Sequence, residues 1–324
     1  MTEGKPPVAD WATDFDHTTA EYAAAAPEVW DELRETCPVA HTDRFGGAWM
    51  PVRHDDVAQI AHDTQHFSSE FVIVNDFKPT GETRPRGFAP PITSDPPFHQ
   101  EARRILLPAF SPKAMERWEP ATRKVCAELL DAIALKGAEI DAALEYTQHI
   151  PVRVIAEMLG VPAGDGDKFR RFISRIIETP GQFDEESFDP DDTLDSYLTN
   201  VVLDHREHPK DDLVGFLMNA ELNGEPLSDE HVGGTVALLL IAGIDTTWSA
   251  IGASLWHLAQ HPEDRQRLVD DPAVLPFAVE EFLRMYAPVT MARIVAEDVE
   301  VGGVCMREQD WTLLPFPAAN RDPD

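Results

Sequence analysis

The feature that most constrains this chain is a long stretch without proline between Ser228 and Pro262. Ser228 is a typical helix N-cap, and Asp229 and Glu230 after it favour the first turn of a helix. If the helix runs unbroken from Asp229 to His261, its 33 residues span about 50 Å at about 1.5 Å per residue. A helix of that length crosses an ordinary domain, so the other elements must pack around it.

The composition predicts a folded protein without nucleic-acid or membrane partners. The chain has 324 residues, of which 43% are hydrophobic, enough for a large core. Its 58 acidic and 27 basic residues give a net charge of −31, which opposes binding to nucleic acid or to an anionic membrane. The first 36 residues contain no signal-like apolar run, and the longest uncharged apolar run, 232–244, has 13 residues where a bilayer needs roughly 20. We therefore expect a cytoplasmic protein whose long helix lies in a buried core.

Helical patterns predominate elsewhere, so the expected fold is mainly α with a small β region. Asp95 and Pro96 are predicted to begin a helix that Pro108 ends near Leu107. Further helices are predicted at about 114–135, 147–159, 167–177 and 195–207, and the acid-rich segment 184–192 is predicted to be a loop. Strands are expected at 47–52 and within 294–311, with a turn at Gly302-Gly303.

Polar residues interrupt the apolar run of the long helix at Ala242-Gly243-Ile244-Asp245-Thr246-Thr247. A buried carboxylate or hydroxyl is costly unless it is hydrogen-bonded, and a threonine can bond back to the carbonyl one turn earlier. Gly243 permits a close approach, so the segment could form a polar notch facing a pocket. The alternative is that Gly243 ends one helix and Asp245 caps the next.

Two further groups of charged residues fall on helical faces. Glu281 and Arg284 are three residues apart, which usually gives a surface ion pair, although the apolar residues around them favour burial. His99 and Arg103 are four apart and can point at one anion, and Arg293 is a third cation in an otherwise apolar segment. Without a bound dianion, the His99–Arg103 pair would be an ordinary solvated face.

Taken in order, these segments resemble the cytochrome P450 family over nearly the whole chain. Residues 95–99 followed by Arg103-Arg104 resemble its C helix, and residues 242–247 resemble the oxygen-activation motif of its I helix. Residues 281–284 match its E-x-x-R motif, and residues 319–323 resemble the start of its meander. Each motif alone is weak, but the ordered set is specific.

The resemblance implies a single P450-like domain over residues 1–324, built around haem b and acting as a monooxygenase. His99, Arg103 and Arg293 would hold the haem propionates, with Ala242 and Gly243 beside the cofactor and substrate. Asp245 and Thr246 would relay protons during dioxygen reduction, and Thr247 is a weaker candidate. The expected structural ion pair joins Glu281 and Arg284, with Arg321 as a partner. Substrate would contact Val289, Thr290, Met291 and the loop 71–92.

The resemblance also implies partners. Because no flavin or iron–sulfur motif is visible, electrons should come from a ferredoxin and its reductase to an enzyme expected to be a monomer. Arg103, Arg104 and Lys113 form a candidate basic patch for that partner on an otherwise acidic protein.

The family's iron ligand is a cysteine thiolate in a glycine-rich loop after the meander. Cys37, Cys126 and Cys305 lack the glycines and phenylalanine of such a loop, so the ligand is expected beyond residue 324 and this chain is expected to be an inactive fragment. One alternative is a non-catalytic P450-like fragment without haem, which a Phe-x-x-Gly-x-x-x-Cys segment in the continuing reading frame would argue against. Another is a peroxide-using enzyme of the same fold, against which the Asp245–Thr246 pair argues.

Overall fold

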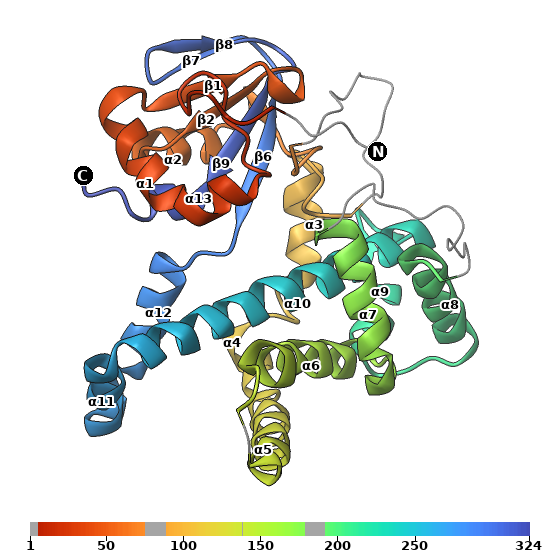
Figure 1. The fold of residues 1–324 in the computed structure, drawn as a ribbon. Helices are drawn as coiled ribbons and strands as arrows, with labels where there is room; N and C mark the ends of the chain where they lie inside the picture. Colours follow the sequence, from red (N-terminus) through yellow and green to blue (C-terminus); the bar gives the residue numbers. More distant parts are fainter. Residues whose placement is uncertain (1–5, 75–88, 138, 179–191) are drawn as a thin grey trace. The chain divides into compact units, whose positions relative to one another are not determined.

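The computed structural model describes residues 6–74, 89–137, 139–178 and 192–324 (Figure 1). The chain divides into two compact units. The first comprises residues 1–86, 92–96 and 276–324, and the second comprises residues 87–91 and 97–275. The prediction that residues 1–324 form a single domain depends on how these two units associate. It therefore stays a prediction.

The first unit is built on a five-stranded sheet whose strands come from both ends of the chain (Figure 1). The strand order is β1 (Val39–Thr42), β2 (Ala48–Pro51), β9 (Trp311–Pro315), β6 (Thr290–Val295) and β3 (Phe67–Ser68). β2 and β9 are parallel, and the other neighbouring pairs are antiparallel. All five residues of β9 are buried because this central strand is covered on both faces.

Helices and a hairpin complete the first unit. The helices are α1 (Ala20–Thr36), α2 (His54–His62), α12 (Leu275–Met285) and α13 (Phe316–Ala319). β7 (Val299–Val301) and β8 (Val304–Met306) are joined by Gly302 and Gly303, whose φ values of 58° and 82° suit a two-residue type I′ turn. The predicted turn is therefore confirmed. Fully buried Phe15, Leu33 and Trp311 belong to the cluster that joins α1 to the sheet.

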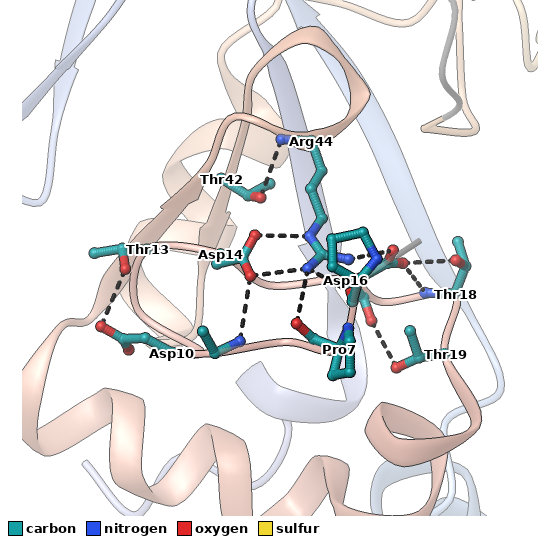
Figure 2. Close-up of polar contacts among 11 residues, drawn as sticks. Pro7, Asp10, Thr13, Asp14, Asp16, Thr18, Thr19, Thr42 and Arg44 are labelled. Atoms are coloured by element: carbon teal, nitrogen blue, oxygen red, sulfur yellow. Dashed lines mark hydrogen bonds and ion pairs between the residues drawn. The ribbon is translucent and has the colours of Figure 1, made fainter. Parts of the chain in front are cut away.

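The N-terminal segment of this unit is held by the guanidinium group of Arg44, as Figure 2 shows. Arg44 donates from Nε and Nη2 to the two carboxylate oxygens of Asp14, at 2.7 and 2.8 Å, and from Nη1 to fully buried Asp16 at 3.2 Å. Nη2 also donates to the carbonyl oxygens of Pro6 and Pro7. Hydrogen bonds from Arg44 and from the Ala9 amide lower the pKa of Asp14 to about 2.

We expect the Arg44→Ala variant to lose an acid-dependent part of the stability of the first unit. The folded-state pKa of Asp14, about 2, lies below its usual value of about 3.9. Its contribution is therefore complete above about pH 4 and is lost as pH falls toward about 2. Urea unfolding at several pH values should show a difference between wild type and Arg44→Ala that shrinks over this range. Arg123→Ala, which breaks an exposed pair with Glu119, is the control and should show little change.

The second unit is helical and organised around α10 (Asp229–Gln260), against which α6 (His149–Leu159) and α8 (Leu194–Glu207) pack. Its other helices are α3 (Phe98–Leu106), α4 (Pro112–Glu116), α5 (Glu119–Lys136), α7 (Gly166–Ile173), α9 (Leu213–Met218) and α11 (Pro262–Asp270). Single π-turns at Ala143–Thr147 and Ser174–Glu178 adjoin α6 and α7, and β4 (Glu221–Leu222) and β5 (Glu225–Pro226) form a short hairpin.

α10 confirms the long-helix prediction. Ser228 is the N-cap and accepts a hydrogen bond from the backbone amide of His231, and the helix runs without a break to Gln260. The alternative in which Gly243 ends one helix is therefore wrong. A Cβ atom added at Gly243 would lie 3.4 Å from Ile155 Cδ1, so the glycine lets α6 pack close to α10.

The burial of α10 differs from the expectation of a core helix covered along its length. One stripe is buried, comprising His231, Val232, Thr235, Val236, Leu240 and Ile244. Among the described residues, none after Ile244 in this helix is buried, and Trp256 is 55% exposed. By length and composition α10 could cross a membrane, and only 17% of its most apolar window is buried, although core helices of soluble proteins pass the same test.

Two element boundaries differ from the sequence predictions. α3 begins at Phe98 rather than at Pro96, and the carboxylate of Asp95 instead accepts hydrogen bonds from Ser68 Oγ (2.6 Å) and the Ser69 amide (2.7 Å) in the first unit. The helix predicted at 114–135 is two helices, α4 and α5, because Pro120 has no amide hydrogen to continue the first helix and instead lies in the first turn of the second. The helices predicted at 147–159, 167–177 and 195–207 are present as α6, α7 and α8.

Candidate functional site

The middle of α10 carries the predicted acid–alcohol pair. Thr246 Oγ1 donates a hydrogen bond to the carbonyl oxygen of Ala242 at 2.8 Å, the back-bonding expected of a threonine within a helix. Asp245 and Thr246 are partly buried, whereas Ala242 and Thr247 are exposed and Ile244 is fully buried. Ala242, Asp245 and Thr246 are spaced three and four residues apart and so share one face of the helix. That face can present a carboxyl group and a hydroxyl group together.

The α3 cations lie on one helical face, as predicted. His99 is partly buried and Arg103 is exposed, one turn further along α3. Within the described part of the chain, neither side chain makes a hydrogen bond or an ion pair. Both therefore keep donors available for an anion.

Arg293 lies in β6 of the first unit and is partly buried. Its Nη1 donates to the carbonyl oxygen of Ala292 at 2.7 Å. Burial lowers the pKa of Arg293, and the carboxylate of Asp95 offsets part of this effect. The desolvation of this half-buried guanidinium is offset only in part by Asp95 and by one hydrogen bond, so the group suits an additional anionic partner. His99 and Arg103 belong to the other unit, so their convergence with Arg293 on one group stays a prediction.

Glu281 and Arg284 form the predicted ion pair on α12. Arg284 donates from Nε and Nη2 to the two carboxylate oxygens of Glu281, both at 2.7 Å, and this lowers the pKa of Glu281. The pair is not buried, since the Arg284 side chain is 46% exposed and the Glu281 side chain is 60% exposed. Phe277, one turn before Glu281, is 77% exposed. The expectation that the pair is buried is therefore wrong in the described structure, although Phe282, Met285 and Tyr286 nearby are partly buried.

The same helix is tied to the residues after α13, but not as expected. Arg284 Nη1 donates to the carbonyl oxygen of Asn320 at 2.5 Å, and Asn320 Nδ2 donates back to the Arg284 carbonyl at 3.3 Å. Arg321 does not pair with Glu281, because its Nε and Nη2 donate to the carbonyl oxygen of Met285, at 3.2 and 2.7 Å. Asn320 and Met285 were not predicted as partners of these arginines, because they accept through backbone carbonyl groups, which leave no signal in the sequence.

The predicted substrate contacts are described only in part. Val289 precedes β6, whose first two residues are exposed Thr290 and partly buried Met291. Most of the predicted substrate loop 71–92 and of the acid-rich loop 184–192 lies outside the described residues.

The residues predicted to form a basic patch are exposed, and a fourth exposed cation follows them in the sequence. Arg103, Arg104 and Lys113 are exposed, and exposed Arg117 at the end of α4 extends the series. Within the described residues, none of the four forms an ion pair, whereas other exposed cations of this unit do, as in the Arg123–Glu119 and Arg206–Asp229 pairs. These cations therefore have no ion-pair partner among the described residues, although Glu101 lines the same hollow as Arg104.

The three cysteines have ordinary environments. Cys37 is the C-cap of α1, with Sγ 3.5 Å from the Val39 carbonyl oxygen, and Cys126 lies on α5 near Tyr146. Cys305 is exposed on β8. None has the flanking residues expected of an iron ligand.

Comparisons with known proteins agree with these motifs. A family model described as Cytochrome P450 matches residues 184–324. The mycinamicin IV hydroxylase/epoxidase of Micromonospora griseorubida is 31% identical over 299 residues, which cover 90% of this chain and 74% of the relative. The vitamin D(3) 25-hydroxylase of Pseudonocardia autotrophica is 33% identical over 288 residues, covering 86% and 69%.

A solved structure gives the same result for the fold. CYP109E1 from Bacillus megaterium, in complex with testosterone, superposes with a TM-score of 0.80 at 30% identity, covering 94% of this chain and 79% of that one. The chain thus spans about three quarters of the length of its relatives, and it has the mainly helical P450 fold. It belongs to the cytochrome P450 family.

Proposed function

We propose that this protein is a haem-thiolate monooxygenase that inserts one atom of dioxygen into a small organic substrate and reduces the other to water. The observation that carries the proposal is the Asp245–Thr246 pair on one face of an unbroken α10, in a chain of this family. A peroxide-using enzyme has no need of protons delivered during dioxygen reduction, so this pair favours the monooxygenase.

Haem b combines an apolar ring with two carboxylates, and three described cations are of the type that binds such carboxylates. Half-buried Arg293 lacks a full set of acceptors, and His99 and Arg103 offer donors on one face of α3. We assign these three residues to the propionates and Ala242 and Gly243 to the neighbourhood of the ring. When bound, haem supplies the redox-active iron at which dioxygen is reduced.

Asp245 and Thr246 would move protons at this site. The Thr246 hydroxyl has one donor hydrogen and two lone pairs, and its bond to the Ala242 carbonyl fixes the side chain while leaving both lone pairs to accept. To pass a proton on, the hydroxyl must turn its own hydrogen away from the Ala242 carbonyl while it accepts one from the Asp245 carboxyl group, which is then reprotonated from solvent. Both residues are partly buried, which limits their contact with bulk water but leaves a path for reprotonation.

We propose that the thiolate ligand is a cysteine outside residues 1–324. Absorption spectra of the reduced, CO-treated protein test this together with the function. A longer product of the same reading frame that contains a Phe-x-x-Gly-x-x-x-Cys segment should show the thiolate-type Soret band, and the 324-residue chain should not. A thiolate-type band in the 324-residue chain that disappears on replacing Cys37, Cys126 or Cys305 by alanine would refute the assignment, and a colourless longer product would favour a non-catalytic protein.

For the substrate we propose a small, largely apolar organic molecule that contacts Val289, Thr290 and Met291. The support is the apolar character of β6 and the compounds named for two relatives and one solved structure, which are mycinamicin IV, vitamin D(3) and testosterone. We also propose that the protein is a cytoplasmic monomer. We propose further that it receives electrons from a ferredoxin, because the cations at 103–117 form no ion pair with described residues on a chain whose net charge is −31.

Reversing charge in this patch should slow electron delivery. The double variant Arg104→Glu/Lys113→Glu is expected to accept electrons from a ferredoxin about tenfold more slowly at low salt, and the difference should shrink as salt screens the attraction. Stopped-flow reduction of the haem-loaded protein measures the rate. The matched control is Arg267→Glu, which reverses an exposed arginine on α11 that forms no ion pair with any described residue. Equal rates for the double variant and the control would exclude this docking surface.

A further inference from the structure

Two histidines and one aspartate meet where α10 ends and α11 begins. His257 lies in the last turn of α10, His261 links the two helices, and Asp264 lies in the first turn of α11. One potential ligand atom of each residue lies within 4.8 Å of those of the other two. We propose that these three side chains bind a divalent transition-metal ion of the zinc type, independently of the monooxygenase function.

The geometry is close to that of a coordination site. The His257 and His261 rings stack with their centroids 4.3 Å apart at an interplanar angle of 25°, and His257 Nε2 lies 3.0 Å from Asp264 Oδ2. In a tetrahedral zinc site with bonds of about 2.1 Å, neighbouring ligand atoms are about 3.4 Å apart. The described spacing therefore brackets the required one, and binding one ion requires the two rings to rotate out of their stacked arrangement.

The donor types select the class of ion. Two imidazoles and one carboxylate suit zinc, nickel, cobalt or copper, whereas calcium and magnesium need sites made of oxygen atoms. The carboxylate of Glu263 lies 3.3 Å from His261 Nδ1 and can orient that ring, as carboxylates beside metal-binding histidines commonly do. Three protein ligands leave a fourth position for water.

The surroundings favour a cation. The site lies at the C-terminal end of the 32-residue α10, where the carbonyl groups carry partial negative charge, on a protein with a net charge of −31. Within the described chain, no lysine or arginine forms an ion pair with Asp264 or Glu263. The His261 and Asp264 side chains are 46% and 47% exposed, so an ion can reach them from solvent.

Calorimetric titration of the tag-free, chelator-treated 324-residue chain with ZnCl2 tests the proposal. We expect one ion per chain and a loss of affinity of at least about tenfold in His257→Gln and in Asp264→Asn. The matched control is His208→Gln, because His208 contacts a single carboxylate, Asp204, at 3.2 Å and belongs to no group of three potential metal ligands among the described residues. Its affinity should equal that of wild type.

A second measurement does not depend on the folding of any variant. Wild-type protein with one equivalent of Co2+ should show the intense visible absorption of a tetrahedral site with nitrogen and oxygen ligands, and Zn2+ should abolish it. Zinc should also raise the melting temperature of wild type and of His208→Gln. Binding that is equally tight in His257→Gln, or scattered over many weak sites without the tetrahedral cobalt spectrum, would overturn the proposal.

Discussion

In the haem-loaded longer product of the reading frame, replacing Asp245 by asparagine is expected to lower product formation about 10²-fold or more, with haem content and fold unchanged. Asparagine has nearly the same shape but cannot release a proton, and general-acid groups contribute roughly 10²- to 10⁴-fold to rates. Asp245 is only partly buried and asparagine fills nearly the same volume, so the substitution should be structurally mild. The measurement is product formed per electron consumed. Electrons that are delivered without protons are expected to yield partly reduced oxygen species instead of product.

The two threonines beside Asp245 provide a matched pair. Thr246→Val removes a hydroxyl that is partly buried and bonded to Ala242, and it should lower product per electron in the same direction. Thr247→Val removes an exposed hydroxyl one position away and should leave the yield within about twofold of wild type. If all three variants retained the wild-type yield, protons would have to come from another group, and the proposed role of this helix face would be wrong.

Local signals account for what could be predicted from the sequence. The start of α10 at Ser228 and the Gly302-Gly303 turn both depend on residues within one turn of each other, and both predictions are correct. The Glu281–Arg284 pair was predictable for the same reason, because a spacing of three residues places two side chains on one helical face.

Long-range contacts account for what could not be predicted. Asp95 has the sequence context of an N-cap, yet Ser68 and Ser69 bind its carboxylate. Arg321 was expected beside Glu281, but it finds the backbone carbonyl of Met285, and any residue type can supply a carbonyl. The apolar side chains of α12 suggested burial, but burial depends on which element covers them, and a helix's own sequence does not contain that information.

Replacing Asp212 by alanine should destabilise the second unit by about 3 to 5 kcal/mol, the usual cost of removing one partner from a buried charged pair. Asp212 Oδ2 lies 3.0 Å from Nε2 of His205, whose side chain is 1% exposed, and Oδ1 accepts the Gly215 amide at 2.9 Å and so caps α9. The other ring nitrogen of His205 lies 2.8 Å from the Val201 carbonyl oxygen. The truncation therefore removes a helix cap and leaves a buried imidazole without its carboxylate.

Asp212→Asn separates these two losses. The asparagine oxygen can still cap α9, and its amide group can donate to His205 if the ring is neutral with its proton on Nδ1, toward Val201. We therefore expect a smaller loss, below about 2 kcal/mol, since only the charge of the pair is removed. Urea unfolding followed by circular dichroism measures both variants. Similar losses in the two would mean that the charge itself, rather than the hydrogen bonds, holds α8 to α9, and a loss below about 1 kcal/mol in Asp212→Ala would show that water replaces the carboxylate without cost.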